Sequence, residues 1–209
     1  SRILIKNFKK AKIFIIDLPE SNFLSSYFLM RHYPKKKFIL YKDIKKDKLT
    51  SNQFKNNNIF ILPPWVKIPS LKFDIFLNIR SFMEMDKKVI ESYFNFIQKN
   101  IKIDGTFLNI NRYEKSTTGK PIRFYQYPYD NNWKVLFSNP TWTHSNIHTL
   151  ITKRTNKRHD IKIGLQEIKI LTFKDYFKLN KNFIKRLLPS RIFVLLVNFK
   201  NRINNYFLK

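Results

Sequence analysis

Short apolar runs alternate with helically spaced apolar residues along the first half of the chain. The runs "KIFII", "KFILY", "NIFIL" and "FDIFLN" are bounded by charged or turn-forming residues, which is typical of buried parallel strands. Between them, Phe23, Tyr27 and Met30 share one helical face, and residues 86–101 repeat apolar positions at helical spacing. This alternation predicts an α/β fold, with a mostly parallel sheet and helices on both faces.

The opening of the chain is helical in pattern as well. In "SRILIKNFKK", Leu4 and Phe8 stand four residues apart, and no capping residues precede them. A chain that opens inside an element is expected to be a fragment, truncated at its N-terminus.

From Arg112 onward, the chain is aromatic and rich in turn residues. The pattern predicts a long loop leading into one or two antiparallel strands, of which "WKVLF" is the clearest, and a short helix or turn at "THSNIHTLITKRT". The tail is basic and helical in pattern, with Pro189 interrupting it. We therefore expect a domain over residues 1–160 and a basic helical extension over residues 161–209 that packs on it.

Composition narrows the class of protein. Hydrophobic residues make up 43% of the 209 residues, enough for a sizeable core, and no run approaches the roughly 18 apolar residues that span a bilayer. Cysteine is absent, which excludes disulfides and thiolate metal sites. The first residues lack the pattern of a signal peptide, so a cytoplasmic location is expected.

The net charge of +27 allows two interpretations. Such a charge usually indicates nucleic acid, an anionic membrane or another acidic polymer as partner. The chain is also rich in Lys, Asn, Ile and Phe with only 3 Gly, which is typical of an A+T-rich coding bias. The positive residues look scattered along the sequence, which favours compositional drift, because a nucleic-acid footprint should cluster on one face.

Polar residues stand where the predicted strands end. Ligands of open α/β sheets bind beyond the carboxyl ends of the strands, so these residues form the candidate site: Asp17, Trp65, Asn78, Arg80, Ser81, Asn109, Asn111 and Arg112. A carboxylate in the position of Asp17 can accept hydrogen bonds from both hydroxyls of a ribose. Equally, Asp17 could cap the next helix or form a turn with Pro19.

Six motifs in order resemble one known family. They are "IIDLPE", "LPPW", "NIRSFMEM", "GTFLNINRYEK", "YPYDNNWKV" and "IHTLITKRT", from about Ile15 to Thr155, and they resemble the sugar O-methyltransferases, a bacterial branch of the class I S-adenosylmethionine-dependent methyltransferases. The resemblance implies a Rossmann-like fold with S-adenosylmethionine as cofactor. It also implies methyl transfer to a saccharide hydroxyl, in the synthesis of a surface polysaccharide or glycoconjugate.

The resemblance also implies roles for individual residues. Asp17, with Leu18 beside it, would hold the cofactor ribose, and Trp65 would lie near the adenine. The methionine end of the cofactor and the acceptor would face a cluster formed by Asn78, Arg80 and Ser81. The family pattern begins with a strand and a Gly-rich turn, and this chain has neither, because none of its glycines stands in a G-x-G setting. The missing strand would be the central one, so cofactor binding by this chain is expected to be weak or absent.

Candidate catalysts follow from the chemistry of methyl transfer to a poorly nucleophilic hydroxyl, which a general base assists. His148 lies in a family-like motif, and its alternative is a structural hydrogen-bonding histidine. Glu84 follows a strand end, and its alternative is a carboxylate favoured by a helix N-terminus. Arg112 and Arg154 could hold an anionic sugar or phosphate, or could be solvated surface charges. No metal site is predicted, because His144 and His148 lack a third ligand at recognisable spacing.

Two other classes of function stay open. The first is a non-catalytic basic binding module that keeps a degenerate methyltransferase fold and binds an anionic polymer or a membrane surface, the latter through its basic C-terminal tail. The second is a nucleic-acid methyltransferase. "NIRS" stands where an amine-binding N/D-P-P-Y/F motif is expected, which argues against base methylation, and no specific nucleic acid is predicted as a partner.

Overall fold

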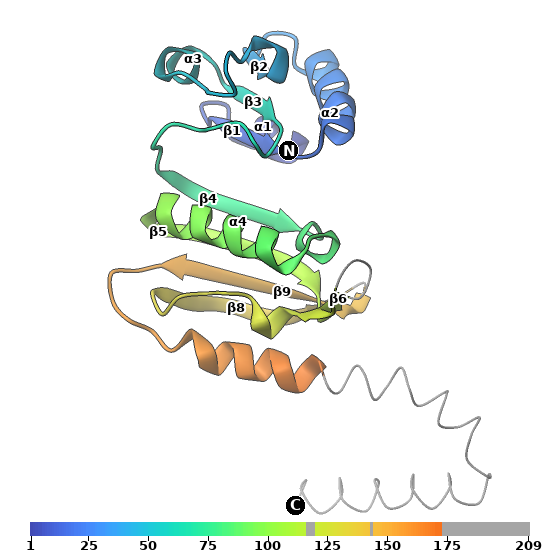
Figure 1. The fold of residues 1–209 in the computed structure, drawn as a ribbon, viewed down its shortest axis with the longest axis vertical. Coiled ribbons are helices and arrows are strands. Elements are labelled where there is room, and N and C mark those ends of the chain that lie inside the picture. Colours follow the sequence, from blue (N-terminus) through green and yellow to red (C-terminus); the bar gives the residue numbers. More distant parts are fainter. Residues whose placement is uncertain (116–119, 143, 173–209) are drawn as a thin grey trace, which may run out of the picture. The chain divides into compact units, whose positions relative to one another are not determined.

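The computed structural model describes residues 1–115, 120–142 and 144–172 (Figure 1). The chain divides into two compact units, unit 1 from Ser1 to Leu71 and unit 2 from Lys72 onward. The domain boundary predicted at residue 160 stays a prediction. Residues 173–209, to which the sequence assigns most of the basic helical extension and its membrane contact, lie outside the described residues.

Unit 1 is a small three-layer α/β/α arrangement. Its elements are α1 (Arg2–Asn7), β1 (Ile13–Ile16), α2 (Pro19–His32), β2 (Phe38–Leu40), the 3-10 helix η1 (Tyr41–Asp43), α3 (Ser51–Asn56) and β3 (Ile59–Leu62). The strands pair in parallel in the order β1-β3-β2. All four residues of β3 are buried, because alternate residues point into cores on opposite faces of the sheet.

The two cores of unit 1 confirm the prediction of helices on both faces. On one face, Ile59 and Ile61 pack with Leu29 of α2 and Ile5 of α1. On the other face, Phe60 and Leu62 pack with Leu49, Val66 and the half-buried Phe54 of α3. The parallel pairing and this layering confirm the α/β class for unit 1.

The helical face predicted from Phe23, Tyr27 and Met30 is not the face that α2 buries. These side chains are 71%, 62% and 43% exposed, whereas Asn22 and Leu29 are buried. Apolar residues occur on several faces of this helix, so its sequence alone does not select the face that meets the sheet. The β3 strand makes that selection, through contact with Leu29.

Unit 2 contains a mixed four-stranded sheet. Its elements are β4 (Phe73–Ile79), the 3-10 helix η2 (Phe82–Glu84), α4 (Lys87–Asn100), β5 (Ile101–Arg112), β6 (Glu114–Lys115), β7 (Ile122–Arg123), the 3-10 helix η3 (Phe124–Gln126), β8 (Trp133–Thr141), β9 (His144–Arg154) and a helix at residues 161–172. The strand order is β4-β5-β9-β8, with β4 and β5 parallel and the remaining neighbours antiparallel. The parallel pairing predicted from the sequence holds throughout the unit 1 sheet and between β4 and β5, whereas the sheet of unit 2 is mixed.

The short helix or turn predicted for "THSNIHTLITKRT" is wrong, because this segment forms β9. His148, Leu150 and Thr152 are buried and alternate with half-buried Thr149 and Ile151. This is the period-two pattern of a strand with one face in the core. The segment is also rich in β-branched residues, which favour strands. The antiparallel strand predicted at "WKVLF" is confirmed as β8.

One face of the unit 2 sheet carries the larger core. The α4 helix lies along β4 and β5 (Figure 1) and directs Ile90, Phe94 and Ile97 into that core, as its apolar spacing predicts. The Phe94 ring lies 5.8 Å from the ring of Phe107 on β5. The helix at residues 161–172 contributes Ile161 and Ile168 to the same core.

The turn predicted at Asp104 and Gly105 lies inside β5 as an irregularity. Asp104 has a φ of 66°, and the register between β4 and β5 shifts beside it. A Cβ on Gly105 would lie 2.9 Å from the backbone oxygen of Lys102 and 3.0 Å from that of Asp74. Only glycine therefore allows the strands to approach here.

The opposite face of the same sheet is apolar and exposed. On β4, Ile75, Leu77 and Ile79 are 51%, 43% and 56% exposed. The β4 strand also forms one edge of the sheet, since β5 is its only partner among the described strands. Within the described residues, no helix is long and apolar enough to cross a membrane.

Candidate functional site

The polar cluster at the carboxyl end of β4 is held by the side chain of Asn78. Its Oδ1 accepts hydrogen bonds from the backbone N–H of Phe82 at 3.3 Å and from Nδ2 of Asn111 at 2.8 Å. Its Nδ2 donates to Oγ of Ser81 at 3.3 Å. These bonds fix the turn that carries the chain from β4 into η2.

Buried amides continue this cluster beneath the sheet end. Asn109 and Asn111 are fully buried on β5, and Nδ2 of Asn111 also lies 2.6 Å from Oδ1 of Asn109. Asn109 in turn donates to the hydroxyl of Tyr129 at 3.0 Å, and burial raises the pKa of that hydroxyl above its ordinary value. The amides satisfy one another, as buried polar groups must. Their evident role is to position the end of β4.

Arg80 and Glu84 are the exposed members of this region. Arg80 has a φ of 62°, and its backbone N–H donates to the oxygen of Ile110 at 2.7 Å. This left-handed conformation is uncommon for a residue with a side chain. Glu84 ends η2, where its N–H bonds the oxygen of Ser81. Both side chains are reachable by a ligand, which is compatible with the roles predicted for them.

His148, predicted as a catalytic base, is wholly buried on β9. Its Nδ1 lies 3.1 Å from the hydroxyl of Tyr113, and its Nε2 lies 2.9 Å from Oγ of Ser138. Burial lowers the pKa of the imidazole to about 4. Both ring nitrogens are therefore engaged within the fold, which favours the alternative of a structural histidine, while the catalytic role stays an untested prediction.

The two arginines predicted to bind substrate differ in their surroundings. Arg154 donates to a carboxylate oxygen of Asp130 at 2.5 Å and lies over the ring of Trp133, 5.1 Å from its centroid. Arg112 is half-buried at the end of β5, and its Nε is buried without a hydrogen-bond partner among the described residues. The guanidinium of Arg154 is thus engaged in an ion pair with Asp130, whereas the Nε–H of Arg112 is available as a hydrogen-bond donor.

In unit 1, Asp17 lies directly beyond β1 with its carboxylate exposed. One carboxylate oxygen accepts the backbone N–H of Leu18 at 2.8 Å. The exposed Leu18, not Asp17, is the N-cap of α2, so the alternative role of Asp17 as a helix cap is not observed, and its turn with Pro19 stays a prediction. A carboxylate can accept further hydrogen bonds at the same time, so the bond to Leu18 does not exclude a ligand.

Trp65 follows β3 and is 47% exposed. Its ring meets that of Tyr41 edge-to-face, with 5.9 Å between the centroids and 89° between the planes. Tyr41 follows β2, so both rings lie at the carboxyl edge of the unit 1 sheet. Sequence reasoning missed Tyr41, because its proximity to Trp65 depends on the pairing of β2 with β3.

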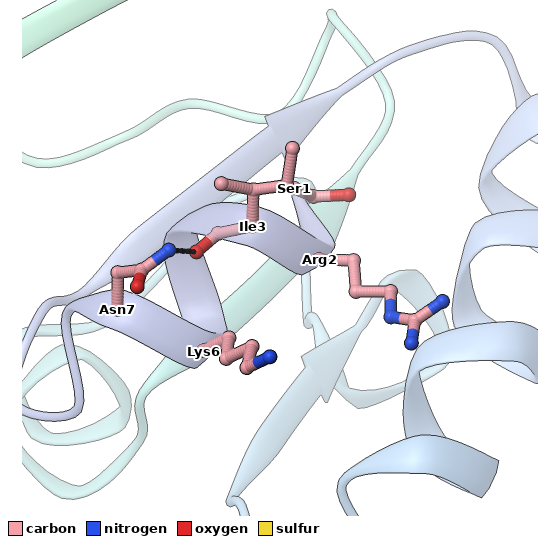
Figure 2. Close-up of a pocket in the computed structure, with 5 residues that line it drawn as sticks. All are labelled: Ser1, Arg2, Ile3, Lys6 and Asn7. Atoms are coloured by element: carbon pink, nitrogen blue, oxygen red, sulfur yellow. Dashed lines mark hydrogen bonds between the residues drawn. The ribbon is translucent and has the colours of Figure 1, made fainter.

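A cavity of about 680 Å³ lies beside α1 (Figure 2). Its lining residues are Ser1, Arg2, Ile3, Lys6 and Asn7. The side chain of Asn7 bonds the backbone oxygen of Ile3 at 2.8 Å. None of the residues predicted to form the site lines this cavity.

Sequence reasoning also missed the partners of His148. Tyr113 is 35 residues away and Ser138 is 10 residues away, and no local spacing connects the three. The described part of the chain holds no group of three or more His, Asp or Glu placed to bind a metal ion.

No protein-family profile matches the sequence, and no curated protein matches it either. Among the solved structures with a distant similarity, one is described as a type 11 methyltransferase from Sulfolobus solfataricus. It has a TM-score of 0.37 and 19% identity, and the match covers 76% of this chain and 95% of that one. A protein from Pyrococcus horikoshii OT3 has a TM-score of 0.37 and 14% identity, over 74% and 87% of the two chains. The pyocyanin biosynthetic protein PhzM has a TM-score of 0.36 and 9% identity, over 73% and 53%. Similarity at this level transfers neither an activity nor a site residue to this chain.

Proposed function

We propose that this chain carries the Rossmann-like part of an S-adenosylmethionine-dependent O-methyltransferase. The observation that carries the proposal is the exposed carboxylate of Asp17 at the carboxyl end of β1. In a parallel sheet, this is the position from which an acidic side chain accepts the hydrogens of a nucleoside ribose. The six motifs that resemble the sugar O-methyltransferases support the same function.

The residues of unit 1 fit the nucleoside part of the cofactor. Asp17 would accept the ribose hydroxyls, and the half-exposed indole of Trp65 offers a face on which adenine can stack. For the methionine part the resemblance implies Asn78, and the side-chain amide of this residue already makes hydrogen bonds to other residues of unit 2. When bound, S-adenosylmethionine supplies a methyl group from its sulfonium.

Glu84 is the better placed of the two predicted bases in unit 2, because its carboxylate is exposed and His148 is buried. In this proposal Glu84 accepts the proton of the acceptor hydroxyl, and Arg112 holds an anionic group of the acceptor. The acceptor is a saccharide hydroxyl of a surface polysaccharide or glycoconjugate, and methylation takes place in the cytoplasm. These finer assignments follow the family resemblance.

The proposal is tested by calorimetric titration of this chain with S-adenosylhomocysteine. Asp17→Asn keeps an oxygen for the Leu18 N–H but removes the charge, and should weaken binding about tenfold, since each hydrogen bond to a charged group contributes about 1.5–3 kcal/mol. Glu20→Gln is the matched control, because Glu20 is an exposed carboxylate in the first turn of α2, and it should bind as the wild type does. Because the sequence predicts weak binding by this chain, the titration extends to high ligand concentration. Equal affinity of the two variants would remove Asp17 from the ribose site. A wild-type chain that binds no ligand even at high concentration would overturn the proposal that this chain by itself binds the cofactor.

A further inference from the structure

Tyr41 and Trp65 form an exposed aromatic pair at the carboxyl edge of the unit 1 sheet. The two side chains are 44% and 47% exposed and contact each other edge-to-face. An edge-to-face pair leaves ring faces open to solvent. Large aromatic side chains that keep such faces exposed are typical of stacking sites for planar ligands.

The fold gathers four lysines around this pair. Lys45 and Lys48 bridge the two sides of a tight turn, in which Lys46 and Asp47 have φ values of 53° and 51°. Lys48 also forms a parallel backbone β-bridge with Lys67, which directly follows Val66 in the segment that carries Trp65. These backbone β-bridges bring two segments with four exposed lysines side by side, an adjacency that the linear sequence does not reveal.

Hydrogen bonds through Asp47 join the segment of the lysine turn to Tyr41 and to the segment that carries Trp65. The hydroxyl of Tyr41 donates to Oδ1 of Asp47 at 2.8 Å, and the N–H of Lys67 donates to the oxygen of Asp47 at 2.7 Å. None of the ion pairs found in the described residues uses Lys45, Lys46, Lys48 or Lys67. We call the exposed residues of these two joined segments the aromatic–lysine surface, in which four lysines outnumber the one carboxylate of Asp47: Tyr41, Lys45, Lys46, Lys48, Trp65 and Lys67.

We propose that the aromatic–lysine surface binds single-stranded nucleic acid without sequence preference. Stacking of unpaired bases on exposed rings, combined with lysines that track the phosphates, is how such strands are bound. Lysine ammoniums act as point charges and read no base edges. A duplex hides its base faces, so single strands are favoured. The proposal does not depend on methyl transfer, and it gives part of the basic charge a specific location.

The experiment measures the fluorescence anisotropy of a labelled oligouridylate of about 12 nucleotides. The variant with Lys45, Lys46, Lys48 and Lys67 all changed to Ala is compared with a control in which four exposed lysines of unit 2, Lys88, Lys99, Lys134 and Lys162, are changed to Ala. Both variants lose the same net charge. Each phosphate contact on a single strand contributes about 0.7 to the slope of log K against log salt. The surface variant should therefore lose about 3 from that slope and bind about a hundredfold more weakly near 0.1 M salt.

Stacking is tested separately at Trp65, which the family resemblance also sets near adenine. Trp65→Leu should weaken oligouridylate binding about tenfold, whereas Trp65→Phe should retain most of it. Equal losses in the two lysine variants would overturn the proposal, because binding would then follow net charge alone. The proposal would also be overturned if a duplex bound as tightly as the single strand. It would be overturned as well if the same variants lost binding to anionic vesicles but kept oligonucleotide binding.

Discussion

The buried imidazole of His148 makes the stability of unit 2 depend on pH. Its ring is fully buried between the hydroxyls of Tyr113 and Ser138, and burial lowers its pKa to about 4. In the unfolded chain, the imidazole returns to its ordinary pKa of about 6.5. The unfolded state therefore binds the proton more tightly, and acid favours unfolding.

The size of the effect follows from the two pKa values. The stabilising contribution is complete above about pH 7.5 and is lost as the pH falls through 6.5 toward 4. At pH 5 the lowered pKa of His148 predicts a loss of about 2 kcal/mol in the free energy of unfolding. Below pH 4, the loss levels off at about 3 kcal/mol. This is a large share of the stability of a small unit.

The assay is urea unfolding of the chain at a series of pH values. Trp133 is fully buried in unit 2, so its fluorescence reports on this unit when Trp65 and Trp142 are replaced by Phe. His148→Gln removes the titrating ring but keeps hydrogen-bonding groups. We expect this variant to be less stable than the wild type at pH 7.5. Between pH 7.5 and 5, its free energy of unfolding should fall by about 2 kcal/mol less than that of the wild-type chain.

Two results would refute this reasoning. In the first, the two proteins lose the same free energy of unfolding between pH 7.5 and 5, which would assign the acid sensitivity to other groups. In the second, the imidazole resonance of His148 titrates with a midpoint at or above 6.5, measured by NMR on the native chain. The NMR measurement stands even where His148→Gln fails to fold.

Two further predictions concern the apolar residues of unit 2. Phe94→Ala removes a fully buried ring at the centre of the core and should lower the free energy of unfolding by about 3–5 kcal/mol. The control Phe137→Ala removes a half-exposed ring and should lower the free energy of unfolding by less than about 1 kcal/mol. Similar losses in the two variants would contradict the assigned core. Leu77→Lys places a charge on the exposed face of the edge strand β4 and should reduce self-association in sedimentation experiments, because lysine on an edge strand opposes strand pairing. The control is Val89→Lys, on the exposed side of α4. An equal effect of the two substitutions would show that self-association does not depend on the β4 edge.

Local patterns were sufficient for much of the fold. The apolar runs that became β1 to β4 are shorter than typical helices and are bounded by charged or turn-forming residues, which together favour strands. The spacing of Ile90, Phe94 and Ile97 determines both the existence of α4 and the face that it buries. The change from apolar strand bodies to polar strand ends likewise located the cluster around Asn78.

Other features depend on contacts between distant segments. The segment that forms β9 was predicted as a helix or turn although its β-branched residues favour a strand, and its pairing with β5 and β8 decides its conformation. The same pairing buries His148 between Tyr113 and Ser138, which changes the interpretation of the most prominent candidate base. A side chain's type is local, but its solvent exposure is a property of the whole fold.

By itself, the sequence determined the α/β class, most of the strands and the places where polar residues interrupt them, because these follow from periodicity along the chain. Only the tertiary structure decided which face of α2 is exposed, which histidine is buried, and which lysines share a surface. The physical reason is that packing and strand pairing join residues far apart in the chain, and the free energy of these contacts outweighs local preference. The aromatic–lysine surface is the clearest case, since the bridge between Lys48 and Lys67 and the ring contact between Tyr41 and Trp65 exist only in the folded chain.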